Sequence, residues 1–249
     1  MSIRHLSKKG KTAVGFLLMI LLLSSISLRY LLQYSVAAKA DVNAVLLAPS
    51  GYSVSKVSEY IRILPDSPNG TGILFYPGGK VDEQAYLPLL SKLAQQGLSI
   101  VLVKMPFHLA IFNINAATGA MASMPDVHDW YLAGHSLGGS MACIYATKNL
   151  SALDGLILLA AYSTSDLSGS ALPILTVYGS EDHVLGDGKL EKYRHNLPVS
   201  AQTRVIAGGN HAYFGNYGEQ QGDGNAAISR ETQQDQTIEY IMEFLKSNQ

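Results

Sequence analysis

Residues 130–146 read Trp-Tyr-Leu-Ala-Gly-His-Ser-Leu-Gly-Gly-Ser-Met-Ala-Cys-Ile-Tyr-Ala. The first four residues form a short apolar run typical of a buried β-strand, and residues 140–146 follow a helical pattern. The glycine-rich segment between them therefore lies at a strand-to-helix turn. Gly134 and Gly138 lack Cβ atoms, so strand and helix can approach closely and hold the serine between them on a sharp turn. The short motif alone can arise by chance, but this placement makes Ser136 the candidate nucleophile.

Apolar runs of β type alternate with helical patterns on both sides of this turn. The runs occupy residues 72–76, 98–103, 130–133, 155–159, 174–178 and 203–206. Short continuous runs of this kind indicate strands buried on both faces, and intervening helices such as 86–95 indicate a parallel, doubly wound sheet. Residues 51–65 alternate more loosely, which is typical of antiparallel edge strands. The sequence therefore predicts an α/β fold with a mostly parallel central sheet and helices on both faces.

A serine hydroxyl becomes a strong nucleophile when a histidine takes its proton and a carboxylate orients that histidine. On a turn of this type the three residues follow the order serine, acid, histidine. His211 fits that order, because it follows the run 203–206 in a glycine-containing loop at the carboxyl end of a strand. His183 would have to precede or abut the acid, and His195 lies in a polar helical stretch typical of a surface.

The acid should directly follow the strand predicted at 174–178. Asp182 is our choice, with the adjacent Glu181 as the alternative, while Asp166 is a weaker candidate because it follows an earlier strand. The acyl-transfer chemistry also needs backbone N–H donors for the oxyanion. We expect them from Leu137, which follows the nucleophile, and from Gly79 in the loop after the first parallel strand, with Lys80 as the second choice for that loop.

The N-terminus reads as a targeting segment. Arg4, Lys8, Lys9 and Lys11 precede an uncharged run from residue 12 to residue 28. The positive-inside rule places this basic end in the cytoplasm and the rest of the chain on the other side of the membrane. Residues 30–32 extend the run to the length of a bilayer span, with Arg29 able to reach the membrane interface, which favours a retained signal anchor. Ala-Lys-Ala at 38–40 resembles a signal-peptidase site and leaves secretion after cleavage as the alternative. We therefore expect residues 1–40 to be an anchor or signal peptide with a linker, and residues 41–249 to be the catalytic domain.

Composition excludes several classes of function. The 249-residue chain has a formal net charge of −1 and no basic cluster beyond its first dozen residues, so we expect no nucleic-acid partner. Cys143 is the sole cysteine, which excludes an internal disulfide and a multi-cysteine zinc site. It falls within the predicted helix, where a small buried apolar role is expected. No metal ligand cluster is visible beyond the residues already assigned, so we expect neither metal nor other cofactor.

Four blocks of sequence carry a resemblance to a known family. They read Phe75-Tyr-Pro-Gly-Gly-Lys80, Val103-Lys-Met-Pro-Phe107, Gly134-His-Ser-Leu-Gly-Gly139 and Gly208-Gly-Asn-His-Ala-Tyr-Phe-Gly215. Together with the order of the acid and the histidine, they make residues 51–245 resemble the α/β-hydrolase superfamily, and within it a lidless dienelactone-hydrolase-like branch attached to membranes. Dienelactone hydrolases use a cysteine nucleophile where this chain has Ser136, so lactone specificity is not carried over. The Gly-Asp-Gly segment at 222–224 also looks like the family, and we expect it to be only a tight turn.

The resemblance implies the α/β-hydrolase fold and a Ser136, Asp182, His211 triad that hydrolyses a small carboxylic ester, or a thioester or amide, through an acyl-enzyme. Members of this fold often insert a lid domain between two late strands. Only residues 163–172 are available there, so no large lid is expected. Two alternatives remain open: an acyltransferase with the same triad, and a catalytically silent binding protein of the same fold.

Overall fold

The computed structural model describes residues 8–47, 49–186 and 188–248. These residues form two compact units, one that ends at Tyr34 and one that begins at Ser35. Arg4 of the predicted targeting segment lies outside the described residues. The two units are considered separately below.

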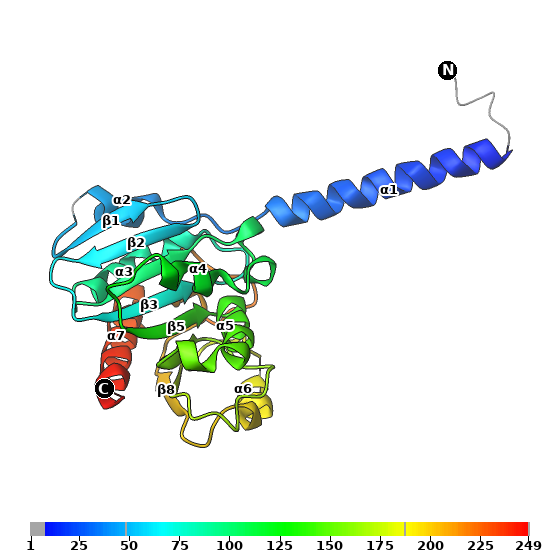
Figure 1. Cartoon of the computed structure of the whole chain (residues 1–249). Helices are drawn as coiled ribbons and strands as arrows, with labels where there is room; N and C mark the ends of the chain where they lie inside the picture. The colour runs from blue at the N-terminus through cyan, green and yellow to red at the C-terminus, as the bar shows by residue number, and fades with distance from the viewer. Residues whose placement is uncertain (1–7, 48, 187, 249) are drawn as a thin grey trace. The chain divides into compact units, whose positions relative to one another are not determined.

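The first unit is a single apolar helix, α1 (Lys8–Leu32) (Figure 1). A window of 22 residues within it, Lys11–Leu32, has a mean hydropathy of 2.0, and none of that window is buried. At 1.5 Å per residue the window is about 33 Å long, enough to cross the hydrocarbon core of a bilayer. The expected N-terminal apolar helix is therefore present, with the length and composition of an anchor or a signal sequence.

The second unit is built on an eight-stranded mixed sheet with the order β1-β2-β4-β3-β5-β6-β7-β8. The strands are β1 (Tyr52–Lys56), β2 (Tyr60–Pro65), β3 (Thr71–Tyr76), β4 (Ser99–Val103), β5 (Asp129–His135), β6 (Gly155–Leu159), β7 (Ile174–Gly179) and β8 (Gln202–Ile206). The first two strands pair antiparallel at one edge, and every pair from β4 to β8 is parallel. The predicted α/β-hydrolase fold is confirmed.

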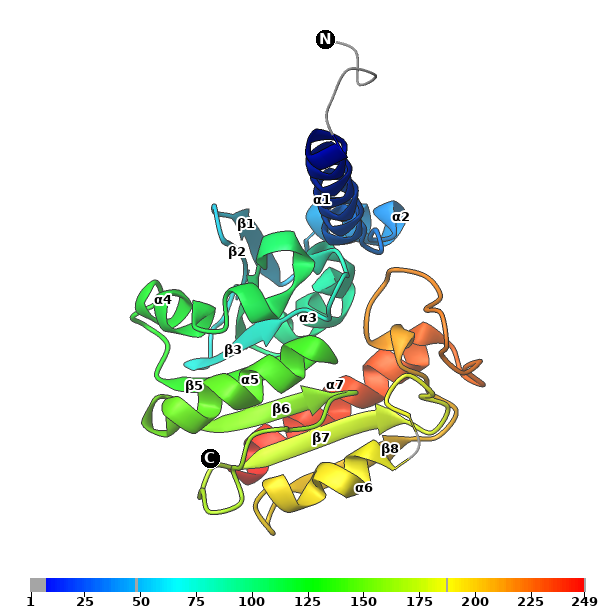
Figure 2. The ribbon, with the colours of Figure 1, turned by 90° about the vertical axis from the view of Figure 1, so that its right-hand side faces the viewer.

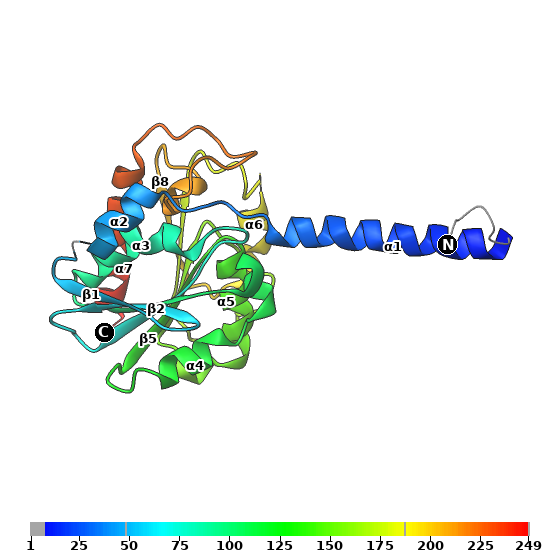
Figure 3. The same cartoon turned by 90° about the horizontal axis from the view of Figure 1, so that it is seen from above.

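Helices cover both faces of this sheet (Figures 2 and 3). The α-helices of the unit are α2 (Lys39–Leu47), α3 (Leu87–Ala94), α4 (Ala116–Ala122), α5 (Leu137–Lys148), α6 (Lys189–Tyr193) and α7 (Arg230–Ser247). Short 3-10 turns join them, including η2 (Glu83–Tyr86), η3 (Pro106–His108), η4 (Ala110–Phe112), η5 (Leu150–Ala152), η6 (Arg194–Asn196) and η7 (Ala212–Phe214). Seen from above, α3 and α7 lie on one side of the strands and α4 and α5 on the other (Figure 3).

Each face of the sheet has its own apolar core. Side chains from β2, β3 and β4 alternate between the two: Ile73 and Phe75 pack with α3 and α7, whereas Leu74 and Tyr76 pack with α4 and α5. All six residues of β3 are buried, as expected for a strand covered on both faces. This two-sided burial is the reason that the central strands read as continuous apolar runs in the sequence.

The carboxyl ends of the parallel strands share one edge, where such sheets bind their ligands. The connection from β6 to β7 runs from Ala160 to Pro173 without a helix, so no large lid stands there. Residues 215–229, coloured orange in Figure 2, loop out beyond the carboxyl ends of β6 and β7 before α7 begins.

Candidate active site

Ser136 sits at the junction of β5 and α5 with an unusual backbone. Its φ of 51° and ψ of −120° lie in a region that non-glycine residues rarely adopt. The turn is close-packed: a Cβ at Gly134 would lie 2.6 Å from the carbonyl carbon of Gly138, and a Cβ at Gly138 would collide with the carbonyl oxygen of Tyr76. The main-chain N–H of Ser136 donates to the oxygen of Leu159 at 2.9 Å, which ties the turn to β6. The strain is therefore held by the surrounding strands, as in other sharp turns at functional sites.

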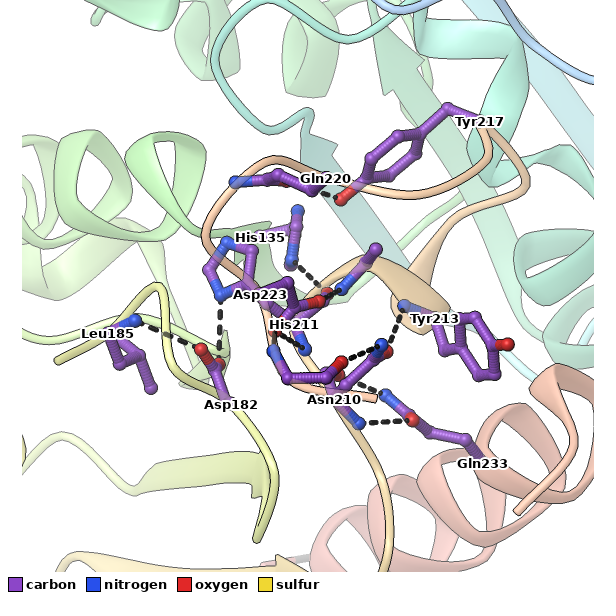
Figure 4. Close-up of polar contacts among 12 residues, drawn as sticks. His135, Asp182, Leu185, Asn210, His211, Tyr213, Tyr217, Gln220, Asp223 and Gln233 are labelled. Carbon is purple, nitrogen blue, oxygen red and sulfur yellow. Dashed lines mark hydrogen bonds and ion pairs between the residues drawn. The ribbon is translucent and has the colours of Figure 1, made fainter. Parts of the chain in front are cut away.

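His211 and Asp182 meet in a direct hydrogen bond. His211 Nδ1 lies 2.8 Å from Asp182 Oδ2, and each side chain is 1% exposed (Figure 4). The second oxygen, Oδ1, accepts from the N–H of Leu185 at 2.9 Å, so both carboxylate oxygens are occupied. Because a carboxylate accepts at Nδ1, a neutral imidazole in this arrangement carries its proton there and leaves Nε2 as the proton acceptor.

Ser136 and His211 line the same cavity. It has a volume of about 210 Å³ and is walled by residues from the turn after β5, the end of β6 and the loop after β7. Nε2 of His211 is buried and has no hydrogen-bond partner among the described residues. Buried polar atoms usually have a hydrogen-bond partner, so the unpartnered Nε2 is an exception that calls for an explanation.

The predicted oxyanion donors are the main-chain N–H groups of Leu137 and Gly79. Leu137 is the first residue of α5, where main-chain N–H groups have no partner within the helix. In the loop after β3, Gly78 N–H donates to Tyr86 Oη and Lys80 N–H donates to His108 O, whereas no described residue accepts from Gly79 N–H. A Cβ at Gly79 would lie 2.8 Å from Cδ2 of Leu137, so the two residues are close neighbours.

The other candidates from the sequence lie away from this arrangement. Glu181 accepts from the hydroxyl of Ser180, and Asp166 accepts from the hydroxyl and N–H of Ser168 on the surface. His183 and His195 are exposed. None of these four residues is hydrogen-bonded to the imidazole of His211, whose described partner is Asp182.

Three residues outside the predicted triad contact the site and were not assigned a catalytic task from the sequence. His135 and Asp223 hydrogen-bond the main chain at His211, and Tyr86 hydrogen-bonds His135. His135 precedes the nucleophile in the central motif, and Asp223 belongs to the Gly-Asp-Gly segment. The motif positions were visible in the sequence, but the contacts join residues that are distant along the chain.

Cys143 is buried in α5, and this burial raises the pKa of its thiol to about 12. The thiol therefore stays protonated and does not act as a nucleophile. Within the described ranges, no group of three or more histidine, cysteine, aspartate or glutamate side chains is arranged to hold a metal ion.

Comparison with known proteins places these features in a wider group. A family model described as alpha/beta hydrolase family matches residues 72–235. A search of curated proteins finds no sequence that matches. Among solved structures, Est1E from Butyrivibrio proteoclasticus with bound ferulic acid superposes with a TM-score of 0.58 at 14% identity, covering 80% of this chain and 98% of that chain.

Two further structures have a similar fold. A membrane phospholipase A, described as a bacterial virulence factor, has a TM-score of 0.59 at 13% identity and covers 96% of this chain and 98% of that chain. A bacterial heroin esterase has a TM-score of 0.59 at 13% identity, with coverage of 83% and 89%. At these identities the structural likeness shows the fold alone.

Proposed function

Because the chain belongs to the alpha/beta hydrolase family, we propose that it is a serine hydrolase that cleaves a carboxylic ester through an acyl-enzyme intermediate. One observation carries the proposal. His211 is hydrogen-bonded to Asp182 through Nδ1, while its buried Nε2 is vacant beside a cavity that Ser136 also lines. These features support the proposal, because a serine nucleophile is activated by a histidine whose other ring nitrogen is held by a carboxylate.

In the first half-reaction, Ser136 Oγ attacks the ester carbonyl while its proton moves to Nε2 of His211. The Asp182 carboxylate stabilises the imidazolium that forms. The N–H groups of Gly79 and Leu137 donate to the developing oxyanion, and the N-terminal end of α5 favours its negative charge. The tetrahedral species then collapses: the bond to the alkoxy group breaks, and the leaving oxygen takes the proton from Nε2.

The second half-reaction regenerates the serine. Water gives a proton to His211 Nε2 and attacks the acyl carbonyl, and the same two amides stabilise the second oxyanion. Collapse releases the carboxylic acid and returns the proton to Ser136 Oγ. In each half-reaction His211 Nε2 takes up one proton and then gives it up again. The reaction therefore requires no group beyond these residues and water.

The size of the cavity favours a small acyl group. Pockets for drug-sized ligands usually measure about 300–1,000 Å³, whereas this cavity measures about 210 Å³. Its lining includes small or apolar side chains such as Ala160, Ala161 and Val184, which suit the hydrocarbon part of an acyl chain. The esterases among the structural neighbours are consistent with such a substrate class.

We further propose that α1 is retained as a membrane anchor with the catalytic unit outside the cytoplasm. The residues on the N-terminal side of the Ala-Lys-Ala sequence support retention, because they are part of the catalytic unit. Ser35 pairs with Val81, Ala37 is 7% exposed, and Ala38 N–H donates to Asn216 O. Cleavage after Ala40 would remove both of these contacts and the buried Ala37.

Kinetics on short p-nitrophenyl esters test the proposed chemistry. We expect Ser136→Ala to lose turnover and Asp182→Asn to lower kcat by about 10⁴-fold, because the amide favours the wrong imidazole tautomer. Glu181→Gln is the matched control and should keep the wild-type rate, since Glu181 bonds only Ser180 among its described side-chain partners. A larger loss in Glu181→Gln than in Asp182→Asn would overturn the assignment of the acid.

A further inference from the structure

The turn at residues 222–224 makes contacts that its sequence did not reveal. Oδ1 of Asp223 accepts the N–H of His211 at 3.2 Å (Figure 4). Oδ2 accepts the N–H of Ala212 at 2.8 Å. One carboxylate therefore receives two successive main-chain amides at the proposed general base. Hydrogen bonds to an ionised acceptor are roughly twice as strong as neutral ones, so this is a firm attachment.

The glycines on either side explain how Asp223 reaches this position. Gly222 has a φ of +83°, which L side chains rarely adopt. A Cβ at Gly224 would collide with the carbonyl oxygen of Glu181, so the turn is pressed against the loop that carries Asp182. Asn210 Nδ2 donates to Gly224 O at 2.9 Å and closes the contact from the histidine loop. The Gly-Asp-Gly turn thus joins the loop of the acid to the loop of the base.

The carbonyl of His211 is held from the other side by His135. His135 Nε2 lies 3.1 Å from His211 O. A carbonyl oxygen only accepts, so Nε2 carries the proton and Nδ1 of a neutral His135 must be an acceptor. Burial, with a smaller effect from the neighbouring His211, lowers the pKa of His135 well below its usual value and keeps the ring neutral.

The partner of Nδ1 extends this contact to the oxyanion loop. Tyr86 Oη lies 2.9 Å from His135 Nδ1 and donates to it, and the same oxygen accepts the N–H of Gly78 at 3.0 Å. A Cβ at Gly78 would lie 2.7 Å from both His135 Nδ1 and Tyr86 Oη, so the loop packs directly on the pair. A continuous series of hydrogen bonds therefore runs from the residue before Gly79 to the main chain of the proposed base.

We propose that Asp223 and His135 are positioning residues that grip the main chain of His211 at its N–H and its C=O, and thereby set the position of Nε2 relative to Ser136. This inference rests on the proposed function. With Nδ1 bonded to Asp182 and both main-chain groups held, the imidazole retains little freedom to move. A misplacement of about 1 Å in a reacting group can cost about 100-fold in rate, which is the scale of effect expected here.

The test compares the rate of fluorophosphonate labelling and kcat for purified full-length wild type, Asp223→Asn, His135→Phe and His135→Gln. Asparagine replaces one of the two carboxylate oxygens with an NH2 group, which cannot accept a hydrogen bond from a main-chain N–H. Asp223→Asn should therefore lower kcat and the labelling rate about 10- to 100-fold, with KM changed little. His135→Phe keeps a ring but removes the donor and should lose a similar amount. His135→Gln, which can present an N–H near the original Nε2, should recover part of the loss.

Tyr217→Phe is the matched control, because it removes a hydroxyl that bonds Gln220 in the same loop without touching His211. It should label at the wild-type rate. The His211→Ala background separates positioning from folding. If Asp223 acts through the imidazole, Asp223→Asn should not change the residual rate there, whereas a merely structural role would lower the folded fraction in both backgrounds.

The outcomes separate this inference from the function on which it rests. Wild-type activity that disappears in Ser136→Ala but is unchanged in Asp223→Asn and His135→Phe overturns the inference alone. No labelling of wild type overturns the proposed function. In that case the proton NMR signal of the Nδ1–H between His211 and Asp182 still reports positioning: its loss in Asp223→Asn at unchanged thermal stability supports the inference, and its persistence contradicts it.

Discussion

The proposed role of His211 as the base rests on which of its two ring nitrogens already has a hydrogen-bond partner. Nδ1 is bonded to Asp182, and the buried Nε2 is left without a described partner. Burial of an unpartnered ring nitrogen costs free energy, and the proposed role of His211 as general base would explain why Nε2 has no partner in the cavity that Ser136 also lines. The neighbouring His135 is a contrasting case, because both of its ring nitrogens are bonded and its role is to hold other groups.

The lowered pKa of His135 predicts a pH dependence of stability. In the unfolded chain the pKa of this histidine should return to about 6.5. Below that pH the unfolded state binds a proton that the folded state does not, so the free energy of unfolding should decrease by about 1.4 kcal/mol per pH unit as the pH falls. Above about pH 6.5 neither state binds the proton, and this contribution is constant.

Urea unfolding at a series of pH values from about 7.5 to 5 measures this effect for wild type and His135→Gln. The variant lacks the titrating imidazole, so it should take up as many as one proton fewer on unfolding. Its unfolding free energy should therefore depend less steeply on pH than that of wild type. Parallel curves for the two proteins would show that His135 titrates alike in the folded and unfolded states.

The sequence predicts the residues of the proposed triad, but it does not predict the contacts that hold them. The order of Ser136, Asp182 and His211 and their placement after apolar runs are one-dimensional signals. The contacts of Asp223 and His135 with the main chain at His211 span 12 and 76 residues of sequence and depend on how the loops fold. A tight turn was the expected role for residues 222–224, and the structure adds a carboxylate bonded to two amides.

At the level of elements, the site depends on how closely α5 approaches β3. Gly138 lies in the first turn of α5 and its Cα faces the carbonyl oxygens of Tyr76 and Pro77. These residues lead directly into the loop that carries Gly79. The missing side chain at Gly138 therefore allows the two proposed oxyanion donors to lie near one another.

Gly138→Ala tests this packing. Helix propensity alone predicts a gain of about 1 kcal/mol for alanine, whereas the collision with two backbone oxygens predicts a net loss of about 1–3 kcal/mol together with loss of activity. Gly169→Ala, where a Cβ would meet nothing within 4 Å, is the control and should change stability by less than about 0.5 kcal/mol. Thermal and urea unfolding measure both, and a stabilised, active Gly138→Ala protein would contradict the packing argument.

The sheet was read well from the sequence because its central strands are buried on both faces. The sequence did not predict two of the helices, because their apolar residues follow a less regular pattern. α4 (Ala116–Ala122) is rich in alanine and glycine and lacks a clear apolar stripe. α2 (Lys39–Leu47) follows the targeting segment and overlaps the expected linker, so its start is not marked by a change in composition.

At the scale of the whole molecule, the proposed membrane anchor predicts on which side of the membrane the catalytic unit lies. α1 has the length and hydropathy of a span, and basic residues precede it. Residues 35–38 belong to the catalytic unit, so that unit begins only a few residues after Leu32, where α1 ends. The predicted boundary after residue 40 stays a prediction about the mature protein.

Cysteine labelling can determine this topology. Cys143 is fully buried, so wild type should not react with a membrane-impermeant maleimide. Val199 is 100% exposed, and Val199→Cys should give one reactive thiol. In intact cells that express the full chain, we expect Val199→Cys to be labelled in the membrane fraction without permeabilisation. Labelling that requires permeabilisation would place the catalytic unit in the cytoplasm.

The most direct test of the central claim is to locate the covalent adduct left by a fluorophosphonate. The purified protein is treated with the probe, digested and analysed by mass spectrometry, with Ser136→Ala and His211→Ala in parallel. We predict one adduct, on Ser136, that is absent in Ser136→Ala and forms much more slowly in His211→Ala. An adduct on another residue, or equal labelling of wild type and Ser136→Ala, would contradict the assignment of Ser136 as the nucleophile.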